Sequence, residues 1–256
     1  MSLDRPDPTA TLTSRDEFRF LAELILAHAT GDHTLVALHD RRGGTTRFAN
    51  DAIVQNVDQR RVTLAVTAAF GRRQGTATTS DLTVGGVQDV LKRAEAVARL
   101  SPPDPDALPP PEPQDYPVLP TWRADTAAAG PARRLEDARA AIERCAARGC
   151  TAAGFVASSV ATVGLAADTG LFAFEPRTEA RFSLTATRGK ATGWAASAHR
   201  SMDGLAAAER TEAAIAKAER AGEPRELPPG RYTVILEPAA VAGLWSWVLH
   251  HLEAKA

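Results

Sequence analysis

The sequence predicts an α+β fold in which two related helix–meander–helix units form one pseudo-symmetric body, followed by the start of a C-terminal domain. Residues 45–80 alternate apolar and polar side chains with a period of two, and Gly, Asn and Asp interrupt the alternation. This pattern is typical of half-buried antiparallel strands joined by tight turns. Helical periodicity flanks the stretch on both sides, and the same series of patterns starts again after residue 131.

Composition sets the class of protein. The 256 residues are 44% hydrophobic and carry a formal net charge of −1. This is enough apolar material for a sizeable core, and it gives no electrostatic case for binding nucleic acid or an anionic membrane. Cys145 and Cys150 provide no disulfide framework, and no signal peptide or apolar run of roughly 20 residues is present. We therefore expect a cytoplasmic protein.

The first unit is expected over residues 14–100. Ser14 and Glu17 have the spacing of a capping box, which predicts a helix over residues 16–29. A second helix is predicted over residues 84–100, before Pro102 ends it. Between them we expect strands at 34–39, 46–49, 53–57, 62–70 and 76–80, with polar turns at 40–44, 58–61 and 71–75.

A linker is expected over residues 101–131, because ten of the 17 prolines fall in it. Such a segment should run extended and fairly stiff over a surface. The second unit follows over residues 132–222, with a helix from Pro131 to about Gly149 and a second helix over residues 204–221. Its strands are predicted at 153–159, 162–166, 171–174, 180–187 and 193–198.

The second unit resembles the first closely enough to indicate an internal duplication. Phe48 aligns with Leu165, an offset of 117 residues, and Gly75 aligns with Gly193, an offset of 118, so that one gap maintains the register. The alternative is chance similarity between two meanders. The repetition of the flanking helices favours duplication.

Residues 231–256 are predicted to start a C-terminal domain that the chain does not complete. A strand is expected at 231–236, and Pro238 opens a helix with the strongest apolar stripe of the sequence. The stripe needs a covering surface, supplied by the preceding domains or by a domain beyond the chain. The residues expected to dock on a partner are Val241, Leu244, Trp245, Val248, Leu249 and Leu252.

Four segments in order resemble the N-terminal region of the TldD/PmbA family, whose members are also described as modulators of DNA gyrase. They are TRFANDAIVQN, FGRRQGTATTSDLT, AEAVARLSPPDPDALPPP and PPGRYTVILEPAAVAGLWSWVL, and the resemblance extends from about Glu17 to the end. It implies a cytosolic, metal-dependent peptidase assembly that degrades unfolded proteins and processes peptides. In such an assembly a zinc-bearing subunit pairs with a related subunit that has no zinc.

The sequence departs from the zinc-bearing type. There the helix after the RYTVIL-like strand carries His-Glu-x-x-x-His, whose two His share a face toward the metal. Here the helix has no His-Glu pair, and the adjacent His250 and His251 point about 100° apart. The resemblance therefore implies a zinc-free, PmbA/TldE-like subunit with no catalytic, cofactor or metal residue of its own. Its expected partners are a zinc-bearing TldD-like subunit and an unfolded peptide substrate.

Other candidate sites have ordinary structural explanations. His28, His33, His39 and His199 are scattered, Gly43 and Gly44 lack the context of a phosphate-binding loop, and Ser158 and Ser159 have no nucleophile elbow around them. A second hypothesis is a non-enzymatic protein-binding or regulatory module, or a truncated inactive fragment. Peptide turnover in the presence of a zinc-bearing partner separates the first hypothesis from these.

Overall fold

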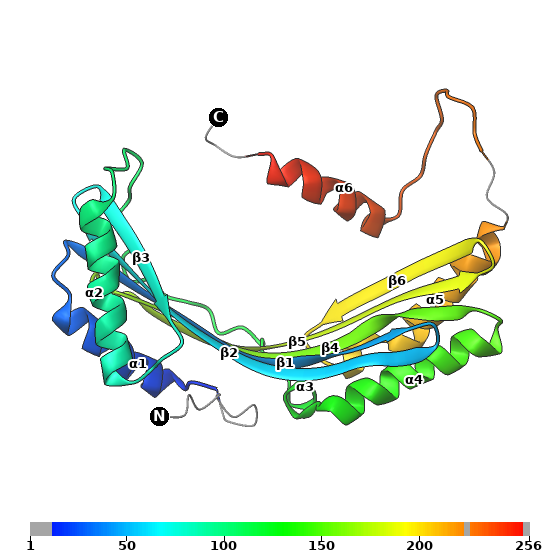
Figure 1. Cartoon of the computed structure of the whole chain (residues 1–256), viewed down its shortest axis with the longest axis horizontal. Helices are drawn as coiled ribbons and strands as arrows, with labels where there is room; N and C mark the ends of the chain where they lie inside the picture. The colour runs from blue at the N-terminus through cyan, green and yellow to red at the C-terminus, as the bar shows by residue number, and fades with distance from the viewer. Residues whose placement is uncertain (1–11, 223–225, 253–256) are drawn as a thin grey trace. The chain divides into compact units, whose positions relative to one another are not determined.

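The computed structural model describes residues 12–222 and 226–252, and residues 12–222 are built around a single antiparallel sheet (Figure 1). The six strands lie in the order β3-β2-β1-β4-β5-β6. Their bounds are His33–Ala49 for β1, Ala52–Phe70 for β2, Arg73–Thr79 for β3, Thr151–Ala167 for β4, Phe172–Arg188 for β5 and Ala191–His199 for β6. The α+β class predicted from the sequence is confirmed.

Helices cover one face of this sheet at both ends (Figure 1). α1 (Arg15–His28) and α2 (Val84–Leu100) form one core with β1–β3, and α4 (Pro131–Ala147) and α5 (Ala207–Ala221) form a second core with β4–β6. Val36 belongs to the first core and Phe48 to the second. Since the two residues are an even number of positions apart on β1, both cores lie on the same face.

A pseudo-two-fold relation connects the two halves, as the duplication predicts. β1 and β4 each have 17 residues, and their first residues, His33 and Thr151, differ by 118 positions. At this offset Arg42 is equivalent to Val160, and these two residues pair with each other across β1 and β4. The pseudo-axis therefore passes between them. The predicted alignment of Phe48 with Leu165 is wrong by one position, since the offset of 118 makes Ala166 the equivalent.

Two equivalent glycines let a helix approach each edge strand. A Cβ added to Gly75 on β3 would lie 2.2 Å from the Ala98 nitrogen and 2.6 Å from the Ala94 oxygen of α2. A Cβ added to Gly193 on β6 would lie 2.0 Å from the Ala214 oxygen of α5. No side chain fits at such distances. The alignment of Gly75 with Gly193 made from the sequence therefore identifies a shared packing requirement.

The strands are longer than the sequence indicates, and the polar turns predicted at 40–44 and 58–61 are wrong. β1 and β2 pair continuously through both stretches, with one register shift between Arg47 and Phe48. In the second half β4 joins the predicted strands 153–159 and 162–166, and β5 joins 171–174 and 180–187. The β1–β2 hairpin turns instead at Asn50 and Asp51, both with positive φ.

The helices agree more closely with prediction. The capping box of Ser14 and Glu17 is present at the start of α1, and α2 has the predicted bounds. α4 ends before Gly149, whose φ is +65°. The fifth helix starts later than expected, because a 3-10 turn, Asp203–Leu205, occupies its predicted first residues.

The proline-rich linker runs over the surface of the body, and a short helix, α3 (Ala124–Ala128), lies in its last part. On the face of the sheet opposite the helices, residues 108–111 line a shallow cleft with His33 and Leu35. Thr169 Oγ1 donates a hydrogen bond to the Pro111 carbonyl. The domain boundaries proposed from the sequence stay predictions.

Residues 226–252 belong to a second unit, described here by itself. It contains α6 (Pro238–His250), but the strand predicted at 231–236 is wrong, since these residues form no strand. Within the described residues of this unit there is no other strand with which the segment could pair. Among the described residues of the whole chain, no helix is long and apolar enough to cross a membrane.

Candidate functional site

A buried carboxylate, Asp40, lies at the centre of the helix-covered face. Its side chain is 0% exposed. Arg60 donates to it from Nε at 3.0 Å and from Nη2 at 2.6 Å, and Thr13 donates to Asp40 Oδ2 from its amide and its hydroxyl at 2.8 Å each. Burial alone would raise the pKa of Asp40, but the Arg60 and Thr13 hydrogen bonds outweigh it and lower the pKa. Asp40 is therefore an ionised anchor.

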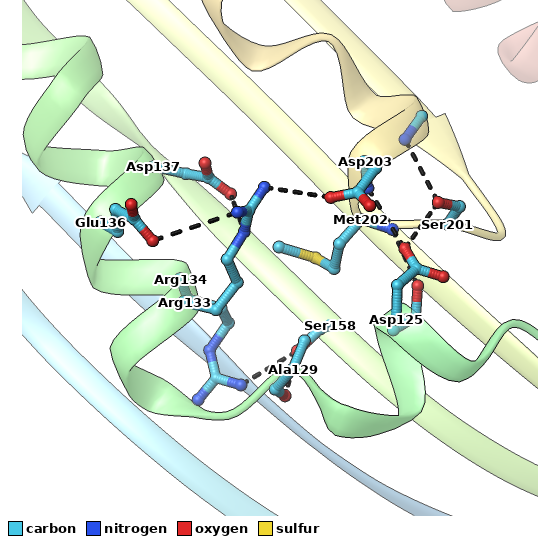
Figure 2. A network of polar contacts seen from close by, with 12 residues as sticks. Asp125, Ala129, Arg133, Arg134, Glu136, Asp137, Ser158, Ser201, Met202 and Asp203 are labelled. Carbon is cyan, nitrogen blue, oxygen red and sulfur yellow. Dashed lines mark hydrogen bonds and ion pairs between the residues drawn. The ribbon is translucent and has the colours of Figure 1, made fainter.

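A second buried charge, Arg134, lies on the other side of the pseudo-axis and is also 0% exposed. From α4 it points onto the sheet, where its Nη2 donates to Asp58 Oδ2 at 2.5 Å and its Nη1 donates to Ser158 Oγ at 3.0 Å. Ser158 in turn donates to the Ala129 carbonyl at 3.3 Å (Figure 2). A Cβ on Gly44 would lie 2.4 Å from Arg134 Nη2, so Gly44 makes room for the guanidinium.

The two clusters have equivalent tasks. Asp40 and Ser158 are equivalent at the offset of 118, and each fixes the backbone just before a helix. Asp40 bonds Thr13 next to α1, whereas Ser158 bonds Ala129 next to α4. The clusters orient helix starts. Ser158 has no base as a hydrogen-bond partner among the described residues, so the geometry does not assign it the role of nucleophile.

A polar network connects α3 and α4 to the loop after β6 (Figure 2). Ser201 Oγ donates to Asp125 Oδ2 at 2.6 Å, and this bond lowers the pKa of Asp125. On α4, Arg133 points away from Arg134 and forms ion pairs with Asp137 at 3.4 Å and Asp203 at 3.4 Å. Burial raises the pKa of Asp137 although Arg133 lowers it. The network holds the linker's end in place.

Three clefts adjoin these clusters. One of about 330 Å³ lies at the start of α4 and includes Arg42, Asp58 and Ser158. A more apolar one of about 530 Å³ extends from Arg42 to Trp122. The third, of about 370 Å³, lies in the first half and is lined by Thr13, Glu17, Phe20, Leu21, Arg60 and Leu82. All three are open to solvent and none contains a recognisable set of acid, base and nucleophile.

The docking residues predicted from the sequence lie on or just after α6. Val241, Leu244, Trp245, Val248 and Leu249 are on the helix, and Leu252 follows it. No residue of α6 is buried, so nothing tests their docking and it stays a prediction. The His250 and His251 rings meet edge to face, and no group of three metal-binding side chains occurs among the described residues. The absence of zinc from this chain also stays a prediction.

The two cysteines are not suited to act as nucleophiles. Cys145 and Cys150 are both buried and unpaired, and burial raises the pKa of the Cys145 thiol to about 11. A thiol with such a pKa is protonated at neutral pH and is a poor nucleophile. The two cysteines therefore serve as residues of the second core, Cys145 on α4 and Cys150 just before β4.

The sequence pattern missed Asp40, Arg60 and Arg134, although one signal was available. On β1 the buried positions are Thr34, Val36 and Leu38, and the next position of the same face is Asp40. Continued alternation would have placed this carboxylate inside, where it requires a cation.

Part of the first half of the chain matches a known protein family. Residues 36–98, which cover most of β1, all of β2 and β3 and nearly all of α2, match the family model for PmbA/TldA metallopeptidase domain 1. This part of the chain is therefore similar to the first domain of the TldD/PmbA family. The resemblance expected from the sequence is thus confirmed at the level of the family. No curated protein matches the sequence.

Solved structures share the TldD/PmbA fold. TldE from Thermococcus kodakarensis is 18% identical with a TM-score of 0.67, and the match covers 80% of this chain and 46% of that one. Two further structures are of proteins named as modulators of DNA gyrase. The one from Thermotoga maritima is 14% identical with a TM-score of 0.71, and the match covers 83% of this chain and 50% of that one. The one from Bacteroides thetaiotaomicron is 16% identical with a TM-score of 0.77, and the match covers 92% of this chain and 56% of that one. The chain thus spans about half the length of the structures it matches.

Proposed function

We propose that this chain is a component of a TldD/PmbA-like metal-dependent peptidase, acting as a subunit without zinc beside a zinc-bearing partner in the cytoplasm. The observation that carries the proposal is the match of residues 36–98 to the first domain of a metallopeptidase family. The described body supplies anchored helices and open clefts rather than a catalytic constellation. Its role is to enclose substrate and to form subunit surface, while the partner contributes the metal.

Helix α6 supports the zinc-free assignment. A metallopeptidase helix needs two His on one face and a Glu that acts as the base on the bound water. α6 reads PAAVAGLWSWVLH and has a single His at its last position. Its apolar residues, led by Trp245 and Leu249, suit a subunit or domain contact instead.

The test is co-purification of the chain with a zinc-bearing relative from its own host, followed by metal analysis and digestion of an unfolded peptide. We expect a stoichiometric complex with one zinc-bearing subunit, and cleavage that chelation abolishes. A chain that binds protein partners and supports no peptide turnover with any metal would establish the binding module instead.

A further inference from the structure

The chain's own linker covers the part of β5 that does not pair with β6. β6 pairs with β5 only from Ala180 onward, so the preceding part of β5 is an edge. There the Thr178 amide donates to the Thr121 carbonyl at 3.0 Å, and Thr121 Oγ1 donates to the Pro176 carbonyl at 2.7 Å. The Arg123 amide donates to Thr178 Oγ1 at 3.1 Å. An extended segment thus adds to this edge through one main-chain hydrogen bond and two bonds in which a threonine hydroxyl takes part.

The linker then fills the space between this edge and the helices. Thr126 on α3 is 2% exposed, and its Oγ1 donates to the Arg200 carbonyl at 2.9 Å and accepts from the Met202 amide at 2.8 Å. The Asp125–Ser201 bond closes the same region (Figure 2). Residues 119–126 therefore show what kind of segment this place in the fold accepts.

The equivalent place in the first half is open. β3 pairs with β2 only from Leu64 onward, so residues 55–63 of β2 form an edge. At the offset of 118, Arg60 corresponds to Thr178 and Asp58 to Pro176, and Arg42–Arg60 and Val160–Thr178 are equivalent pairs. The Arg60 amide and the Asp58 carbonyl therefore point away from β1. No backbone hydrogen bond from elsewhere in the described residues reaches them.

The open cleft of about 370 Å³ adjoins this edge, because Arg60 lines both. This cleft corresponds to the place that the linker occupies in the other half. Its residue Leu82 is equivalent to Arg200 at the offset of 118, and its residue Thr13 precedes α1 as Ala129 precedes α4. Phe20, Leu21 and Leu82 supply apolar surface, and Phe20 is 59% exposed. Val54 and Val57 on the edge strand are also exposed.

We propose that an extended, unfolded peptide adds to the edge of β2 at residues 55–63 and places an apolar side chain in the cleft beside Phe20 and Leu82. The linker on β5 identifies the occupant as an extended segment, because it shows the same fold element holding one. Exposed, unpaired edges of this length are otherwise sites of uncontrolled association. The proposal extends the proposed function by giving this subunit its own peptide-binding surface, and it needs neither partner nor catalysis.

The test is fluorescence anisotropy of the full chain with a fluorescein-labelled peptide of ten alternating threonine and leucine residues, with lysine at both ends. We expect saturable binding that is lost when every peptide amide is N-methylated, since that removes the main-chain donors and leaves the side chains. Equal binding of the N-methylated peptide would show simple hydrophobic adsorption and overturn the proposal.

A matched pair of variants locates the site. Phe20→Asp should weaken binding about tenfold or more, because the cleft loses apolar surface and gains a charge. Leu100→Asp, at an exposed position of α2 outside the cleft, should leave the affinity unchanged. Equal effects of the two substitutions would contradict the assignment. Two further outcomes would also contradict the proposal. One is peptide binding that occurs only after residues 1–11 are deleted, and the other is pairing of the β2 edge with a second copy of the chain that excludes the peptide. Failure of co-purification with a zinc subunit would leave these results intact.

Discussion

In the half of the sheet built from β4–β6, the linker follows the free edge of β5 and buries Thr126 beneath it, whereas in the half built from β1–β3 the equivalent edge meets no such segment among the described residues. The strands, the helix pairs and even the glycine contacts correspond in the two halves. The difference therefore arises from one added segment rather than from the repeated fold. A duplicated unit can therefore keep its architecture while one of its two copies retains an open strand edge.

The largest difference between equivalent positions is expected at Asp40 and Ser158. Asp40→Asn should lower the free energy of unfolding by about 3 kcal/mol, because the partly buried Arg60 guanidinium loses its fully buried, charged partner. Ser158→Ala should cost only about 1 kcal/mol, since Arg134 keeps Asp58. Urea unfolding followed by circular dichroism measures both values. Equal losses would contradict the expectation that the charged Asp40 stabilises the fold more than the neutral Ser158.

The glycine contacts are expected to respond alike. Gly75→Ala and Gly193→Ala should each cost about 2–3 kcal/mol, because the new methyl group overlaps the backbone of α2 or α5. Gly85→Ala on α2 is the control, since its Cβ would meet nothing within 4 Å and alanine favours the helix. Thermal unfolding of the three variants checks this. A Gly193→Ala variant as stable as the Gly85→Ala variant would refute the shared packing requirement.

Acid should sharpen the difference between the two anchors. The pKa of Asp40 is lowered in the folded chain, so its stabilisation is present above the unfolded pKa of about 3.9 and is lost as the pH falls through the folded value. Between pH 6 and pH 3 the wild type should therefore lose more of its free energy of unfolding than Asp40→Asn loses. Other carboxylates contribute equally to both proteins. Parallel curves would contradict an ionised Asp40.

The smallest effect is expected at the surface between α4 and α5. Arg148 pairs with Glu219 at 2.8 Å across these helices, and both side chains are partly exposed. Arg148→Ala should cost about 0.5 kcal/mol, and 1 M NaCl should remove most of the difference. In the first half Arg99 instead lies over the Phe70 ring and donates to Thr30. A loss that persists in high salt would indicate packing rather than charge.

The sequence pattern predicted the helices and the duplication well because caps, prolines and periodicity are local signals. The capping box at Ser14 and the bounds of α2 are examples. It failed at residues 40–44 and 58–61, where charged residues suggested turns. Asp40 and Arg60 are instead paired inside the sheet, and such pairing is a non-local property that no short window contains.

The candidate sites divide in the same way. α6 forms where local signals predict a helix, and the docking of its apolar residues stays a prediction. The open edge of β2 was not found, because it depends on which strand stops first. β3 ends its pairing at Leu64 of β2, and the linker passes to the other half of the sheet. Only the topology shows both facts.

Amide hydrogen exchange of the full chain, followed at Arg60 and Thr178 with and without the threonine–leucine peptide, shows directly whether the edge of β2 is open and accepts a peptide strand. We expect fast exchange at Arg60 in the free chain and strong protection on saturation with the peptide. Thr178 should be protected throughout, because the Thr121 carbonyl accepts its hydrogen bond. Slow exchange at Arg60 in the free chain, or fast exchange that saturating peptide does not change, would contradict it.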